Sequence, residues 1–108
     1  MRLYHNPRCS KSREAFALLT DRGVEFEDYR YLKLGVDSED FEVLLRLENL
    51  IRIGDVDKGS KYDLNNMNDL RALLEIDSKL LQRPILIHNG KAVIGRPPTE
   101  ILTLLHEV

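Results

Sequence analysis

The sequence predicts an α/β domain in which a βαβ unit comes first, a helical insertion follows, and two strands and a helix close the chain. Segments with the two-residue period of a strand alternate with segments that have the period of a helix. The dipeptide Asn89-Gly90 separates two short apolar runs, which is typical of a hairpin. The chain of 108 residues is long enough for one core of ordinary size, so we expect a single domain over residues 1–108.

The first third is the predicted βαβ unit. Residues 1–5 (MRLYH) alternate weakly and are compatible with a strand. Residues 10–23 carry apolar side chains at helical spacing and stop at Gly23, a residue suited to a left-handed helix cap. Residues 24–32 (VEFEDYRYL) alternate again and are rich in residues that favour strands.

The middle of the chain is predicted to be mainly helical. A helix over 37–51 begins at Asp37, where an acidic residue suits a helix N-terminus, and presents a broad apolar face. Residues 54–66 are rich in Gly, Asp, Lys and Asn and are expected to form a loop. A further helix over 66–82 ends near Arg83, because the proline that follows disfavours helix at the residue before it.

The last third is predicted to be a hairpin and a helix. Residues 84–95 (PILIHNGKAVIG) form two short strands around Asn89-Gly90, a pair that favours a type I′ turn. Residues 96–108 (RPPTEILTLLHEV) open with prolines, which the first turn of a helix tolerates, and continue as an amphipathic helix. This order of elements, with a mixed sheet, is that of a thioredoxin-like fold with a helical insertion. A generic α+β sandwich is the alternative.

The composition argues against several classes of function. The net charge is -2, which gives no overall electrostatic reason to bind nucleic acid or an anionic membrane. No apolar run approaches the roughly 20 residues of a membrane span, and no signal peptide is visible. A single cysteine cannot form an internal disulfide and fits the reducing cytoplasm. We therefore expect a cytoplasmic protein that binds neither membrane nor nucleic acid. We also expect it to be a monomer.

Cys9 has the most distinctive chemical setting in the chain. It lies at the predicted start of the first helix, where unpaired backbone N–H groups and the helix dipole favour negative charge. Arg8 and Lys11 lie beside it, Arg13 follows one turn later, and His5 precedes the loop. Only the thiolate is a good nucleophile, and cysteines in such positions titrate below the ordinary pKa of about 8.5. The setting predicts an activated thiol.

The same features suit a small oxyanion. A helix N-terminus after a tight loop binds anions, and arginine adds forked donors. Ser12 stands where a dithiol oxidoreductase has its second cysteine, so any redox cycle of Cys9 needs an external thiol. The alternative is that Cys9 is a small buried apolar residue and that the neighbouring cations form a solvated face.

Two segments carry a resemblance to a known family. The stretch YHNPRCSKSRE holds His5, Cys9 and Arg13 at the spacing of an active-site motif, and QRPILIHNGKAVIGRPPTEIL holds the pairs Arg83-Pro84 and Arg96-Pro97. Together they resemble the two hallmark segments of the glutaredoxin-coupled arsenate reductase family. The order and spacing of the predicted elements agree with that family over essentially the whole chain.

The resemblance implies a reaction in which Cys9 attacks arsenate to give a covalent thiol adduct. Glutathione then displaces the adduct, and glutaredoxin regenerates the thiol while arsenite leaves. No bound cofactor is expected, because glutathione serves as the reductant. A related possibility keeps the thiol chemistry and takes a glutathione mixed disulfide as the substrate.

The resemblance also implies roles for five further residues. His5 and Arg13 match the motif that keeps the thiolate available. Arg83 and Arg96 match arginines that bind the oxyanion or its adduct. Pro84 matches a proline that is typically cis and shapes the pocket beside the cysteine.

The chain departs from this family in its middle part. Family members with established activity carry a further arginine in the segment that here reads IRIGDVDKGSKYDLN, at a position that falls near Val56. Asp55 and Asp57 flank this position, and acidic neighbours oppose an anion. The nearest cations are Arg52 and Lys58. Full arsenate reductase activity is therefore the point that the sequence leaves open.

A second class of function is a binding module. Related Spx-type regulators use this fold to bind RNA polymerase, and a chain with Ser12 in place of a second cysteine could keep that surface without catalysis. A metal site is not expected, because Cys9, His5, His88 and His106 do not form a closely spaced set of ligands.

Overall fold

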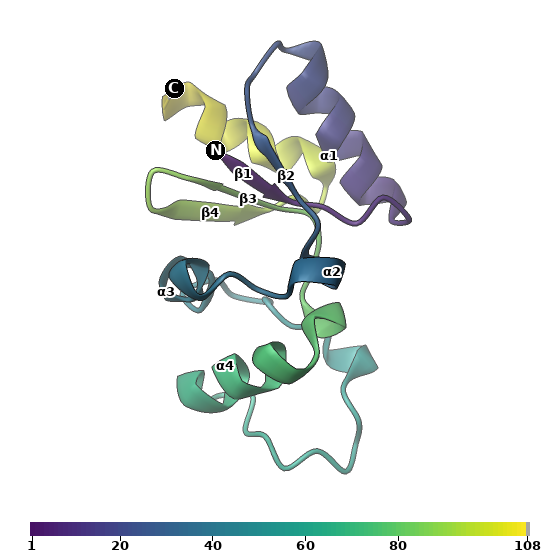
Figure 1. Cartoon of the computed structure of the whole chain (residues 1–108), viewed down its shortest axis with the longest axis vertical. Helices are drawn as coiled ribbons and strands as arrows, with labels where there is room; N and C mark the ends of the chain where they lie inside the picture. Colours follow the sequence, from purple (N-terminus) through teal and green to yellow (C-terminus); the bar gives the residue numbers. More distant parts are fainter. Residues whose placement is uncertain (108) are drawn as a thin grey trace.

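The computed structural model describes the backbone of residues 1–107 and the side chains of residues 1–105. The side chain of His106 and the predicted helix end at Val108 lie outside the described residues. Four strands form one mixed sheet in the order β2-β1-β3-β4, as Figure 1 shows. The strands are β1 (Arg2–Tyr4), β2 (Glu27–Tyr29), β3 (Ile85–His88) and β4 (Lys91–Ile94). β1 pairs with β2 in parallel, whereas the pairs β1–β3 and β3–β4 are antiparallel. This pairing confirms the predicted βαβ unit and hairpin of a thioredoxin-like fold.

Helices cover both faces of the sheet (Figure 1). On one face, α1 (Ser10–Asp21) and the 3-10 helix η4 (Pro98–Glu107) pack over a core centred on Leu3 and Leu86. The other face holds a larger core around Tyr4 and Ile85, which the middle of the chain covers. The helices there are α2 (Tyr31–Leu34), α3 (Phe41–Leu44) and α4 (Met67–Ile76), with short 3-10 turns η1 (Ser38–Asp40), η2 (Ile53–Asp55) and η3 (Ser78–Leu80). No helix in the described part of the chain is long and apolar enough to cross a membrane.

The register of the sheet gathers several chain segments at one end. Tyr4 pairs with Tyr29 on one side and with Ile85 on the other, and Ile85 pairs with Ile94. The loop after β1, the residue after β2, the segment before β3 and the segment after β4 therefore all lie at the same end of the sheet. The predicted type I′ turn at the opposite end is confirmed by positive φ angles of 50° at Asn89 and 72° at Gly90.

The second predicted strand, over 24–32, is shorter in the structure. Only Glu27–Tyr29 pairs, because β1 begins at Arg2 and offers three residues as partners. Tyr31 does not continue the strand and instead starts α2.

The predicted helix over 37–51 is divided into short pieces. It begins as predicted, since the carboxylate of Asp37 accepts the backbone N–H of Glu39 at 3.0 Å. It ends early because the backbone of Leu50 accepts the N–H of Gln82 at 2.8 Å, and Arg52 donates to Leu80 at 2.8 Å. These hydrogen bonds to a distant segment replace those of a continuous helix.

Two further helix boundaries differ from the prediction. The helix over 66–82 separates into α4 and η3, because Asp77 leaves the helical conformation and caps η3 by accepting the N–H of Lys79. The last helix begins at Pro98 and has 3-10 geometry, two residues later than predicted.

Gly95 packs directly against the first of the two arginine-proline segments. Its N–H donates to the carbonyl of Pro84 at 2.8 Å. A Cβ atom built on Gly95 would lie 2.8 Å from Cγ of Pro84 and 3.1 Å from Cγ2 of Ile101. Both neighbours are fully buried, so neither can move away without disturbing the core.

We predict that Gly95→Ala lowers the free energy of unfolding by about 1–3 kcal/mol, because it overpacks this contact. Chemical denaturation of the variant and the native protein measures the difference. Gly54→Ala is the matched control, since a Cβ there meets nothing within 4 Å, and it should change stability by less than about 0.5 kcal/mol. Equal effects of the two substitutions would contradict the packing argument.

Candidate active site

Cys9 is the N-cap residue of α1. Its backbone is extended, with φ -93° and ψ 123°, and its carbonyl accepts the N–H of Arg13 at 3.0 Å, the first hydrogen bond of the helix. Its own N–H donates to the carbonyl of Asn6 at 3.0 Å, which closes the preceding loop. The side chain is partly exposed and free of any disulfide. The first turn of α1 contains no acidic residue, so nothing there opposes a thiolate.

The surroundings of the sulfur lower its pKa. Partial burial alone would raise the pKa of the Cys9 thiol, but the backbone N–H of Ser12, the guanidinium of Arg83 and the backbone N–H of Lys11 outweigh it. The net pKa therefore lies below its ordinary value. The helix start acts on Cys9 as the sequence suggested, whereas Arg83 comes from the far end of the chain.

His5 and Ser12 form a buried support beneath the loop. The Nδ1 atom of His5 lies 2.7 Å from Oγ of Ser12, and the same Oγ accepts the backbone N–H of Asn6 at 2.9 Å. Burial lowers the pKa of His5, as do Arg30 and Arg13, while Asp28 opposes the shift. His5 is therefore a neutral, buried partner of Ser12, and its described hydrogen bonds do not include the sulfur of Cys9.

Arg13 fixes the loop from the outside. Its Nη1 donates to the carbonyl of Pro7 at 3.0 Å, and its side chain is exposed. The N–H of Arg8 donates to Oδ1 of Asn6 at 3.0 Å on the inner side of the loop. The structure thus places Arg13 against the loop that carries Cys9 rather than in a described contact with the thiol.

Arg83 and Arg96 come together at the end of the sheet where Cys9 lies. Nε of Arg96 donates to the carbonyl of Arg83 at 3.0 Å, and Nη1 of Arg83 donates to Lys79 at 3.5 Å. Nε of Arg83 is buried without a hydrogen-bond partner. The peptide bonds before Pro84 and Pro97 are both cis, and the Pro84 side chain is fully buried.

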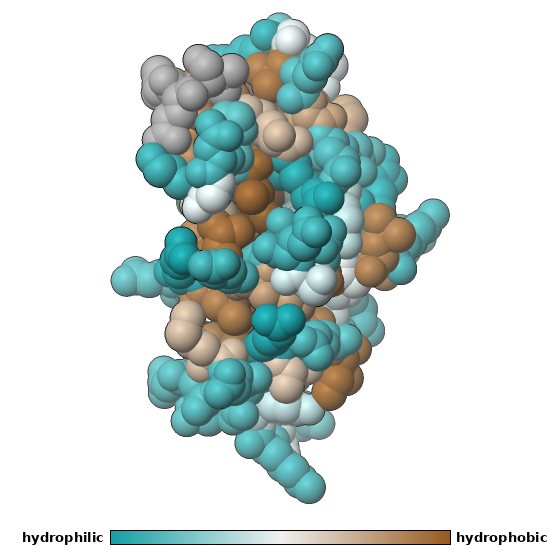
Figure 2. All heavy atoms as spheres, turned by 60° about the vertical axis from the view of Figure 1, so that its left-hand side comes forward, coloured by the Kyte–Doolittle hydropathy of each residue, from teal (hydrophilic) through white to brown (hydrophobic). Residues whose placement is uncertain are grey.

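A groove extends from Arg96 along the outer edge of the sheet. It has a volume of about 430 Å³, and β4 contributes Val93 and Ile94 to it while the middle of the chain contributes Leu47 and Gln82. Figure 2 shows this hairpin side of the molecule, where apolar atoms reach the surface at mid-height between more hydrophilic regions. The groove therefore adjoins the arginine pair and offers both apolar and polar contacts.

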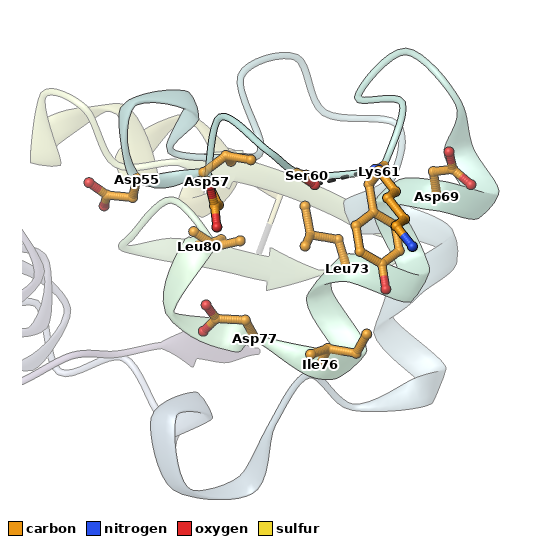
Figure 3. Close-up of a pocket in the computed structure, with 11 residues that line it drawn as sticks. Asp55, Asp57, Ser60, Lys61, Asp69, Leu73, Ile76, Asp77 and Leu80 are labelled. Atoms are coloured by element: carbon orange, nitrogen blue, oxygen red, sulfur yellow. Dashed lines mark hydrogen bonds between the residues drawn. The ribbon is translucent and has the colours of Figure 1, made fainter.

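Val56 lies in a different pocket, formed by the helical insertion. This pocket has a volume of about 570 Å³, and Figure 3 shows Leu80 within it, with Asp57 and Asp77 on either side. Arg52, one of the two cations nearest to Val56 in the sequence, binds Asp55 at 2.7 Å. The surroundings of Val56 are thus acidic, as the sequence indicated.

Tyr31 follows β2 at the end of the sheet where Cys9 lies, and the sequence analysis did not identify it as a candidate site residue. Its side chain is fully buried, and its hydroxyl has no described hydrogen-bond partner. The alternating pattern of residues 24–32 placed it inside a strand, which gave no reason to bring it to Cys9. The signal that could have found it is its position directly after the end of a parallel strand, where sites of α/β proteins form.

Comparison with known proteins gives the family of the chain. The sequence profile described as the ArsC family matches residues 4–104. The chain belongs to the ArsC family. A protein of Neisseria meningitidis named arsenate reductase is 39% identical, with 97% of each chain covered. The solved structure titled arsenate reductase from Vibrio cholerae has a TM-score of 0.77 at 33% identity, covering 95% of this chain and 97% of that one. ArsC relatives also include a protein of Bacillus subtilis named regulatory protein MgsR, 30% identical over 94% of this chain and 86% of that protein.

The ArsC match extends over both segments that hold the candidate residues. No three His, Cys, Asp or Glu side chains among the described residues are grouped so that they could hold a metal ion. The functional groups that the structure does bring together are one thiol, two arginines and the start of a helix. This set can form a thiolate and bind a small anion beside it.

We predict that the rate of Cys9 alkylation by iodoacetamide rises with pH at a midpoint below that of an ordinary thiol. Arg83→Gln should move this midpoint upward by about one pH unit, because it removes a positive charge that favours the thiolate. Arg22→Gln at the other end of α1 is the matched control and should leave the midpoint in place. A native midpoint at the ordinary thiol value would contradict the prediction.

We also predict that Ser12→Ala lowers the free energy of unfolding by about 1–3 kcal/mol, because it leaves the buried N–H of Asn6 without an acceptor. Thermal and chemical unfolding measure the loss. Ser10→Ala in the same turn serves as the control, since Ser10 is exposed and should contribute less than about 0.5 kcal/mol. A Ser12 variant as stable as the native protein would show that the loop does not depend on this hydroxyl.

Proposed function

We propose that this protein is an oxidoreductase of the arsenate reductase type that uses Cys9 as its nucleophile and glutathione with glutaredoxin as its source of electrons. The observation that carries the proposal is the position of Cys9 at the N-terminus of α1 with the guanidinium of Arg83 beside it. The backbone N–H groups at the start of α1 and the guanidinium of Arg83 favour the Cys9 thiolate, and the same groups can bind an anion beside it. The names of several ArsC relatives point to arsenate as the oxyanion.

The proposed reaction begins when the Cys9 thiolate attacks the arsenic atom of arsenate. A sulfur-arsenic bond forms, one arsenic-oxygen bond breaks, and the departing oxygen takes up protons and leaves as water. The adduct still contains As(V), so two electrons are needed to release arsenite. Because Ser12 replaces a second cysteine, two external thiols supply these electrons and end as a disulfide.

The other site residues act on this thiolate and anion. Arg83 and Arg96 bind oxyanion oxygens, a task for which the planar guanidinium is suited. His5 and Arg13 hold the loop that presents Cys9, which keeps the thiolate available. The groove along β4 begins at Arg96 and offers a place for glutathione, whose carboxylates suit this cation. The need for a reduced thiol suits the cytoplasm, and we propose that the protein works there as a monomer.

Two alternatives follow from particular observations. Val56 stands where active family members are expected to have an arginine, so this chain has one cation fewer than they have to bind arsenate. This difference favours a glutathione mixed disulfide as the alternative substrate. The likeness to the regulatory protein MgsR favours instead a binding role, in the manner of Spx-type regulators of RNA polymerase. The second role would require neither Arg83 nor a reactive Cys9.

We expect purified protein to oxidise glutathione in an arsenate-dependent manner when glutaredoxin is present, and Cys9→Ser to abolish this activity. Val56→Arg restores an arginine at the position where active family members are expected to have one, so activity in this variant alone would show that the missing arginine limits the native protein. Consumption of NADPH through glutathione reductase measures the reaction. Absence of turnover by both the native protein and Val56→Arg across a range of arsenate would reject arsenate as the substrate.

The regulatory alternative has its own measurement. Binding of purified RNA polymerase to the immobilised protein, with Cys9→Ser binding as well as the native chain, would favour a binding module over an enzyme. Turnover of a glutathione mixed disulfide without turnover of arsenate would favour the other substrate.

A further inference from the structure

Tyr31 is a buried residue whose polar group the proposed reaction does not yet use. Its side chain is 0% exposed, and its hydroxyl has no hydrogen bond of ordinary geometry, although the side chain of Asn6 lies close enough to lower its pKa. The neighbouring aromatic side chains behave differently: the hydroxyl of Tyr4 donates to Asp40 at 2.6 Å, and that of Tyr29 donates to the carbonyl of Gly35 at 2.7 Å. Buried polar groups nearly always have a partner, and an unpaired one costs stability.

The topology places Tyr31 at the end of the sheet where the site forms. Tyr4 and Tyr29 are paired at the ends of parallel strands, so Asn6 and Tyr31, each two residues further on, leave the sheet side by side. Arg83 lies two residues before Ile85, the antiparallel partner of Tyr4, and reaches the same end. The backbone of Tyr31 is fixed, since its carbonyl accepts Ser78 Oγ at 3.3 Å and the N–H of Gly35 at 2.8 Å.

A second donor at this end also lacks an acceptor. Nε of Arg83 is buried without a hydrogen-bond partner, while the same guanidinium acts on the Cys9 sulfur and donates from Nη1 to the carbonyl of Lys79. The hydroxyl of Tyr31 and Nε of Arg83 are thus two buried donors at this end of the sheet that could bind an oxygen atom. Burial raises the pKa of Tyr31, Cys9 raises it further, and Arg83, Asn6 and Arg52 oppose the shift only in part. The Tyr31 hydroxyl is therefore a neutral donor at the pH at which Cys9 is a thiolate, and its missing partner is an acceptor such as an oxygen atom.

We propose that Tyr31 is a further oxyanion-binding residue, whose hydroxyl donates a hydrogen bond to an oxygen of the tetrahedral anion held at Cys9 and Arg83. The inference rests on the proposed function for the class of ligand. The unpaired hydroxyl destabilises the free protein and gains its partner when the anion enters. A phenylalanine at this position would keep the shape of the core and lose only this bond.

The experiment measures protection of Cys9 from iodoacetamide by arsenate, with no reductant present. We expect Tyr31→Phe to raise the arsenate concentration needed for half-protection by about ten- to a hundredfold, as expected for a lost hydrogen bond to a charged group. Its thermal unfolding midpoint should equal or exceed that of the native protein, because an unpaired buried hydroxyl is removed. Tyr4→Phe is the matched control: it loses a paired hydroxyl, so its unfolding midpoint should fall while protection stays unchanged.

Three outcomes would overturn the inference. Equal protection of Tyr31→Phe and the native protein would show that the hydroxyl does not bind the anion. A lower unfolding midpoint, or failure of this variant to fold, would show a structural role. A shift of the pH midpoint of alkylation measured without arsenate, in place of a shift in half-protection, would show that the hydroxyl acts on the thiol alone.

Failure of the proposed function gives a different result. Protection that depends on Tyr31, without reduction of arsenate in the presence of glutathione and glutaredoxin, would reject the reductase activity and keep the anion site. Turnover that is the same in the native protein and Tyr31→Phe would keep the activity and reject the role of Tyr31. A native protein that arsenate does not protect at all would overturn the inference as well.

Discussion

The pairing of β1 on both sides is the constraint on which the rest of the structure depends. This strand of three residues joins β2 in parallel and β3 antiparallel, so it fixes the chain's first third against its last. Its side chains also hold the middle part, since Arg2 binds Asp37 at 2.8 Å and Asp40 at 2.7 Å, and Tyr4 binds the same Asp40. Because the Cys9 loop follows β1 directly, this register sets the position of the thiol relative to Arg83.

The site combines donors that are far apart in the chain. The helix start supplies the backbone N–H groups of Lys11 and Ser12, and the segment before β3 supplies a guanidinium. The hydrogen bond from Arg96 to the carbonyl of Arg83 joins the ends of the hairpin strands. Each of these contributions is smaller than the cost of partial burial, but together they outweigh it and lower the pKa of Cys9. The residues beneath the loop act indirectly, by fixing the backbone that presents Cys9.

The sequence predicted much of this arrangement because local chemistry decides it. The helix start at Cys9, the cap at Asp37 and the Asn89-Gly90 turn each depend on a few adjacent residues, and all three were predicted from their neighbours. The helix over 37–51 was predicted wrongly beyond its first turns, because backbone bonds to Leu80 and Gln82 replace helical ones. Periodicity carries no information about partners so distant in the chain.

The sequence by itself determined which residues have reactive or anion-binding chemistry, and it placed Cys9 at a helix N-terminus, since helix starts follow from neighbouring residues. The tertiary structure alone decided which donors meet the sulfur. It brings Arg83 to Cys9, turns His5 toward Ser12, and leaves the hydroxyl of Tyr31 buried without a partner. The physical reason is that strand register brings Arg83 and Tyr31 to this end of the sheet from more than twenty positions away, while the turn of the loop between β1 and α1 brings His5 to Ser12, seven residues on. Neither kind of contact leaves a local pattern in the sequence.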